Sequence, residues 1–142
     1  MTPKISVSNR QRMARVDVAT LRDFAQRALA ACLERPRRKS GRLASLGQVE
    51  VVLVSDRRIA GIHRRFMNDP CPTDVITFQH GEIVISVETA KRQARQFGTG
   101  LDHELRLYIA HGLLHLQGFD DKTAAGAGEM KRVQERIVMK AT

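Results

Sequence analysis

The chain has 142 residues, of which 42% are hydrophobic, so it can bury one core and we expect a single domain over residues 1–142. No run approaches the roughly 18 apolar residues of a membrane span, and the first residues lack the apolar stretch of a secretory signal, which favours a cytoplasmic protein without membrane contact. The net charge of +9 predicts an affinity for polyanions.

The N-terminal half predicts alternating strands and helices. A short apolar alternation over 4–7 indicates a strand, and apolar residues at helical spacing over 18–33 indicate an amphipathic helix. The segment 35–42 packs five cations into eight residues with proline, serine and glycine, which predicts a basic loop. A β-branched run over 48–54 indicates a second strand, and the Ser-Asp pair after it is typical of the cap of a helix that reaches about residue 66.

A proline-containing loop and a hairpin occupy the middle of the chain. The prolines within 68–72 block regular pairing and predict a loop. Two apolar segments, 75–79 and 82–87, are joined by a short His-Gly link, which indicates a β-hairpin. Helices are then predicted over 89–97 and 101–116, with a glycine-rich breaker between them.

The C-terminal segment is expected to end in one more helix. Alanines and glycines at 124–128 indicate a loose connection, and 129–139 carries an apolar stripe at helical spacing. Helices and strands interleave along the chain without regular βαβ alternation, and a hairpin lies in the middle. The predicted fold class is therefore α+β.

RNA is the natural polyanion for a basic chain of this size. Positive charge gathers in the segment 35–42, and Arg10, Arg12 and Arg15 form a second cluster. Such a loop is also typical of a solvated surface, although near a reactive centre it would help to hold a phosphodiester. The chain has one tyrosine and five phenylalanines, so we expect recognition of the RNA backbone rather than stacking of bases.

Two histidines lie four residues apart in the run His-Gly-Leu-Leu-His-Leu-Gln-Gly-Phe-Asp-Asp. His111 and His115 share one face of the predicted helix and can bind one metal ion, although such a pair is also typical of histidines that a helix merely accommodates. Gly118 can end the helix in a left-handed conformation and turn the chain back, so that Asp120 or Asp121 supplies an oxygen ligand. Two imidazoles, one carboxylate and a remaining position for water are the ligand set of a catalytic zinc site.

Two neighbouring positions bear on the chemistry. Gly112 stands where zinc proteases of the H-E-x-x-H type carry the glutamate that acts as general base, so that base is absent. Glu104 lies seven residues before His111 on nearly the same helix face. It either orients that imidazole through a hydrogen bond or is a solvated glutamate at the start of the helix.

Three segments resemble one known family. The run 111–120 is similar to the H-G-x-L-H-L-x-G-[YF]-D signature of the YbeY family of bacterial metal-dependent endoribonucleases. Residues 72–78 resemble its P-T-D-V-[LI]-[ST]-F segment, 81–86 its G-[DE]-I-x-I-S strand, and Glu104 a glutamate that the family carries before its first histidine. The likeness covers roughly residues 50–140 and implies a small mixed β-sheet packed against helices, with a zincin-like metal helix.

The resemblance also implies an activity and its partners. Members are single-strand-specific, metal-dependent endoribonucleases, which hydrolyse phosphodiester bonds. They act in ribosomal RNA maturation, including processing of the 3′ end of 16S rRNA, and in ribosome quality control. The chain is accordingly expected to be an enzyme that acts on ribosomal RNA at the ribosome and to use one Zn²⁺ or another divalent ion.

Two positions depart from the family pattern. Asp121 stands where the commonest third ligand is a histidine, and a carboxylate accommodates harder metals better than an imidazole does. Met67 stands where many members place an arginine, and the nearby Arg64 and Arg65 are candidate nucleic-acid-binding residues or part of a solvated basic helix face.

The resulting hypothesis has His111, His115 and Asp121 holding one divalent ion in an endoribonuclease, and it assigns no further catalytic residue. A non-enzymatic, ribosome-associated RNA-binding module with a structural metal is one alternative, which an open coordination position argues against. A metallopeptidase is another, which the missing glutamate base argues against.

Overall fold

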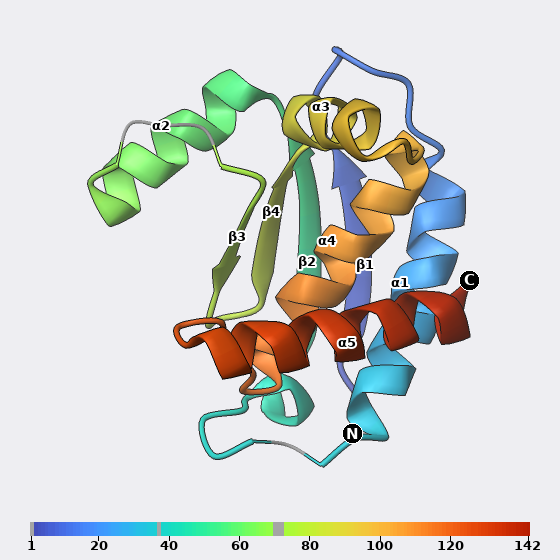
Figure 1. The fold of residues 1–142 in the computed structure, drawn as a ribbon, viewed down its shortest axis with the longest axis vertical. Helices are drawn as coiled ribbons and strands as arrows, with labels where there is room; N and C mark the ends of the chain where they lie inside the picture. The colour runs from blue at the N-terminus through green and yellow to red at the C-terminus, as the bar shows by residue number, and fades with distance from the viewer. Residues whose placement is uncertain (1, 37, 70–72) are drawn as a thin grey trace.

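The computed structural model describes residues 2–36, 38–69 and 73–142, and its centre is a four-stranded mixed sheet in the order β1-β2-β4-β3 (Figure 1). The first three strands of that order run parallel, and β3 pairs antiparallel with β4, as the hairpin signal predicts. Part of the predicted loop at 68–72 lies outside the described residues. The strands are β1 (Lys4–Asn9), β2 (Gln48–Val54), β3 (Val75–Phe78) and β4 (Glu82–Ser86).

Helices cover the sheet unevenly. Within the described residues, α1, α4 and α5 pack against one another on one face, with α3 beside α4, whereas α2 stands apart on the other side of the sheet (Figure 1). None of the helices in these ranges is long and apolar enough to cross a membrane. The arrangement confirms the predicted α+β class. The helices are α1 (Val18–Leu33), the 3-10 turn η1 (Leu43–Ser45), α2 (Asp56–Met67), α3 (Val87–Phe97), α4 (Leu101–Leu116) and α5 (Ala124–Ala141).

The two faces of the sheet belong to different apolar clusters. Successive side chains of a strand point to opposite faces, so Ile83 and Ile85 of β4 join the large core beneath α4 while Val84 joins a small cluster beneath α2. That small cluster contains five buried side chains in the described residues, so α2 leaves part of its face of the sheet uncovered. A groove lined by strand residues and by α2 lies on this face.

The first turn of α2 is tied to the start of α3. The Asp56 carboxylate accepts hydrogen bonds from Ser86 Oγ at 2.6 Å, Thr89 Oγ1 at 2.7 Å and Arg92 Nη1 at 2.6 Å. Hydrogen bonds to a charged acceptor contribute about 1.5–3 kcal/mol each when they are partly buried. Polar contacts therefore fix the first turn of α2 to the end of β4 and the start of α3.

The start of the last helix differs from the sequence prediction. A loose connection at 124–128 is wrong, because α5 begins at Ala124 and continues to Ala141. The Thr123 side chain accepts a hydrogen bond from the Gly126 N–H at 2.9 Å and caps the helix, which offsets the low helix propensity of glycine. A Cβ atom on Gly126 would lie 2.8 Å from the carbonyl oxygen of Asp120, so glycine also lets this turn approach the preceding loop.

Candidate metal centre

The end of α4 turns the chain back toward its own histidines. Gly118 has a φ of +103°, which L side chains rarely adopt, so glycine provides the turn as predicted. The Gly118 N–H donates to the His115 carbonyl and the Phe119 N–H to the Leu114 carbonyl, both at 3.0 Å. These bonds close the last turn of the helix and direct the following residues onto the histidine face.

Three potential ligand atoms converge at this turn. His111 Nε2 and His115 Nε2 lie 3.0 Å apart, and the Oδ2 atom of Asp121 lies 3.9 Å from the first and 4.0 Å from the second. All three lie within 4.8 Å of one another, close enough to share one ion. The structure thus brings together the two histidines and the aspartate that the sequence selects as ligands.

The other ring nitrogens each have an oxygen partner. His111 Nδ1 lies 2.9 Å from Gln134 Oε1, and His115 Nδ1 lies 3.1 Å from the carbonyl oxygen of Phe119. Because both partners only accept hydrogen bonds, each neutral ring carries its proton on Nδ1 and presents a lone pair on Nε2. Two lone pairs facing each other at 3.0 Å repel unless a cation lies between them, so the donor set fits a divalent metal.

The protonation state of His115 favours the same role. Burial lowers the pKa of the His115 imidazole below its ordinary value, and the neighbouring His111 lowers it further. A metal ligand must be the neutral imidazole, and a lowered pKa keeps this ring neutral at neutral pH.

Two acidic residues that the sequence places near the histidines are not part of the metal group. The Asp120 Oδ1 atom accepts a hydrogen bond from the Lys122 N–H at 3.1 Å, so of the two aspartates left open by the sequence only Asp121 joins the histidines. Glu104 is 5% exposed and accepts a hydrogen bond from Thr99 Oγ1 at 2.9 Å. The solvated reading of Glu104 is therefore wrong, and the oxygen beside His111 Nδ1 comes from Gln134 instead.

Gly112 is required by packing. A Cβ atom at this position would lie 2.7 Å from the side chain of Ile83, so α4 can approach β4 this closely only with glycine. The helix position that holds the general base of H-E-x-x-H proteases faces the sheet here and has no room for a glutamate.

The candidate basic residues lie apart from the metal group. Arg64 and Arg65 are exposed on the last turns of α2, where Arg65 lines the groove on the far face of the sheet. Met67, the last residue of that helix, is 51% exposed. Within the basic segment, Arg38 reaches the metal turn: its guanidinium lies 4.3 Å from the Phe119 ring centroid and pairs with Glu129 at 2.7 Å.

The family of the chain follows from its match to known sequences. A family model described as Endoribonuclease YbeY matches residues 6–142, nearly the whole chain. The chain belongs to this family. The resemblance drawn from the sequence motifs is thereby confirmed.

Individual YbeY proteins support the assignment. The Endoribonuclease YbeY of Nautilia profundicola is 40% identical over 100 residues, which cover 65% of this chain and 70% of the relative. That of Koribacter versatilis is 34% identical over 123 residues, which cover 82% of this chain and 78% of the relative. The name of these relatives agrees with the reaction class that the sequence predicted, an endoribonuclease.

The fold is similar to that of a solved protein as well. A Thermotoga maritima protein determined in solution matches with a TM-score of 0.65 and 24% sequence identity, over 96% of this chain and 88% of that one. At this level of identity the likeness supports the fold alone, a mixed sheet with helices on both sides.

Proposed function

We propose that this YbeY-family chain is a single-domain, metal-dependent endoribonuclease that cleaves single-stranded RNA, with ribosomal RNA at the ribosome as its substrate and the cytoplasm as its location. His111, His115 and Asp121 hold one divalent ion, Zn²⁺ by the chemistry of the donors. The observation that carries the proposal is the convergence of two Nε2 atoms and one carboxylate oxygen, with each Nδ1 atom hydrogen-bonded to a fixed oxygen.

The chain's own residues prepare the site. Gln134 and the Phe119 carbonyl set the tautomer and the direction of the two rings, and burial keeps His115 neutral. A divalent ion supplies positive charge against the phosphodiester and lowers the pKa of a water molecule. A set of three protein ligands leaves coordination positions open, which favours a catalytic over a purely structural metal.

The activity is tested with an unstructured RNA oligonucleotide and with a peptide of mixed sequence. We expect metal-loaded protein to cleave the RNA internally, chelator to stop cleavage and added Zn²⁺ or Mn²⁺ to restore it, with the peptide intact throughout. Bound metal without RNA cleavage would instead favour the binding module with a structural metal, and peptide cleavage would favour the metallopeptidase.

Gln134 offers a test of the metal site that does not depend on activity. Gln134→Leu removes the acceptor for the His111 Nδ1 proton, and we expect metal affinity to fall about 10- to 100-fold. Gln134→Glu keeps an acceptor and should retain affinity. The matched control is Gln96→Leu, the same change at an exposed position of α3. Titration with a competing chelator measures all three, and equal affinity of Gln134→Leu and the control would contradict the assignment.

A further inference from the structure

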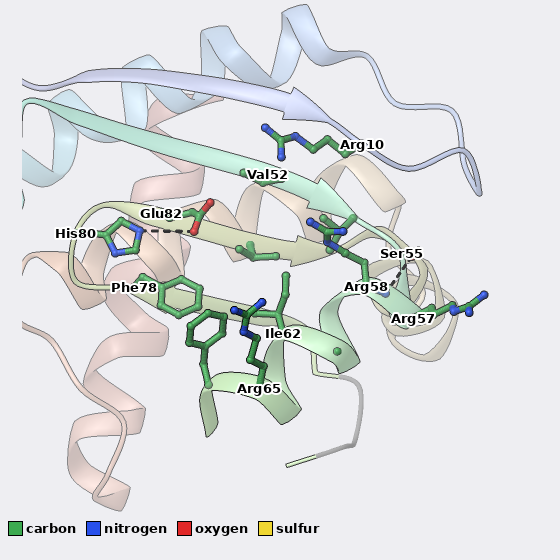
Figure 2. A pocket seen from close by; sticks show the side chains of 14 residues that line it. Arg10, Val52, Ser55, Arg57, Arg58, Ile62, Arg65, Phe78, His80 and Glu82 are labelled. Atoms are coloured by element: carbon green, nitrogen blue, oxygen red, sulfur yellow. Dashed lines mark hydrogen bonds and ion pairs between the residues drawn. The ribbon is translucent and has the colours of Figure 1, made fainter. Parts of the chain in front are cut away.

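A groove of about 990 Å³ lies on the face of the sheet that α2 covers only in part (Figure 2). Its floor is apolar and comes from the strands and from α2, with Val52, Val84 and Ile62 among the lining residues. The histidine-bearing helix α4 packs on the opposite face, where Ile83 contacts Gly112. The groove is therefore a separate surface from the metal centre.

Arginines surround this apolar floor. Arg58 and Arg65 project from α2 over the groove and Arg10 projects over it from the end of β1, while Arg57 extends away at one end (Figure 2). Residues 58 and 65 lie two turns apart on α2, so their Cα atoms are separated by about 10 Å along its axis. Guanidinium groups bind phosphates through paired N–H donors, which fits a polyanion lying along the helix.

The acidic groups at this surface leave the arginines of α2 unneutralised. Glu82 lines the groove and lies 3.6 Å from His80, and Glu50 lies 3.8 Å from Arg10. Among the described residues, neither Arg58 nor Arg65 forms an ion pair with either of these carboxylates. The groove thus carries a net positive charge.

Three aromatic rings gather at one end of the groove. The Phe66 and Phe78 rings are 5.5 Å apart and edge-on, and His80 stacks on Phe78 at 5.5 Å with 18° between the planes. Phe66 is 60% exposed, although a large apolar ring gains by burial. Composition alone argues against base stacking, but the fold brings these rings from α2, β3 and the hairpin turn to one place.

We propose that this groove binds a single-stranded RNA segment, with phosphates on Arg58 and Arg65 and a base against Phe66. Exposed rings beside guanidinium groups are the usual platform for single-stranded nucleic acid, whose bases stack on the rings while its phosphates pair with the cations. The inference rests on the proposed function and deepens it: the groove holds RNA away from the scissile bond, so it sets affinity rather than the chemical step.

Binding of a fluorescent single-stranded RNA, measured by anisotropy with chelator present so that no cleavage occurs, tests the charge. We expect Arg58→Ala/Arg65→Ala to bind at least 10-fold more weakly. The slope of log affinity against log salt concentration should be smaller in magnitude by roughly 1.4 for this variant, because each lost phosphate contact removes about 0.7 from the slope. The matched control is Arg22→Ala/Arg95→Ala, which removes the same charge from exposed positions on α1 and α3. Its affinity and its salt slope should stay close to those of the wild type.

The ring is tested by a second matched pair. Phe66→Ala should weaken binding about 10-fold through loss of stacking. Phe97→Ala removes a ring that is 64% exposed at the end of α3, outside the groove, and should bind as the wild type does. In cleavage assays the groove variants should raise KM with kcat within about twofold, since they remove binding rather than chemistry.

The outcomes separate the two proposals. Wild-type protein that cleaves RNA, with groove variants that bind it no worse than their controls, overturns the groove while the endoribonuclease stands. Groove variants that no longer bind an acidic amphipathic peptide but still bind RNA as the wild type does also overturn the RNA-binding groove. That result would favour a protein partner. Wild-type protein that neither binds nor cleaves RNA overturns both proposals.

Discussion

His115→Ala is expected to lower the rate of cleavage of single-stranded RNA by at least about 100-fold, because it removes a proposed ligand of the ion that would stabilise the developing charge. The substitution removes one of two Nε2 atoms 3.0 Å apart and leaves only His111 and Asp121 of the three candidate ligands. Single-turnover rates at fixed metal concentration measure the effect.

The matched control for this variant is His103→Ala, the same substitution at an exposed position in the first turn of α4. It should leave the rate unchanged. Thermal unfolding of both variants without metal checks that each is folded. A rate for His115→Ala within a few-fold of the control would remove the histidine pair from the mechanism.

The second large effect is expected on stability. Gly118→Ala should lower the free energy of unfolding by about 2–4 kcal/mol, because a φ of +103° strains any L residue and the close approach adds overpacking. A Cβ atom there would lie 2.6 Å from the Arg38 Cβ and 2.9 Å from the Gly41 backbone nitrogen. Chemical denaturation of metal-free protein measures the change.

Gly98→Ala separates conformation from packing. Gly98 also has a positive φ, +68°, but a Cβ atom there would meet nothing within 4 Å, so its cost should be only about 1 kcal/mol. Equal losses in the two variants would mean that the contacts around Gly118 do not constrain the turn. Metal affinity should fall with Gly118→Ala alone, because this turn carries Asp121 to the histidines.

Periodicity predicts the elements that have one strongly buried side. The observed bounds of α1, β2 and α4 coincide with the predicted ranges 18–33, 48–54 and 101–116, since each has a clear apolar pattern and a definite end. Periodicity does not show the start of α5, because alanine and glycine carry no such pattern and the helix begins instead at the cap provided by Thr123.

The candidate site was predictable where it is local in sequence. The spacing of the histidines and the glycine turn predict the convergence of His111, His115 and Asp121, all within eleven residues. Gln134 lies on another helix, and only tertiary packing brings it to His111. One signal was available: it is a polar residue within the apolar stripe of α5, beside the buried Val133 and close to Ile137.

The groove could not be predicted from the sequence. Its rings and arginines come from segments that show no common pattern, and they meet only because β3 pairs with β4 and α2 crosses that face of the sheet. Overall composition counts aromatic residues but says nothing about where the fold places them.

The most direct test of the metal centre is elemental analysis of the wild type and of His111→Ala/His115→Ala, each purified without added metal. We expect about one equivalent of divalent metal per wild-type chain, as three converging candidate ligand atoms imply, and a negligible amount in the folded double variant. Wild-type protein that holds no metal, and that cleaves RNA equally well after treatment with chelator, would contradict the assignment of a metal centre to these residues.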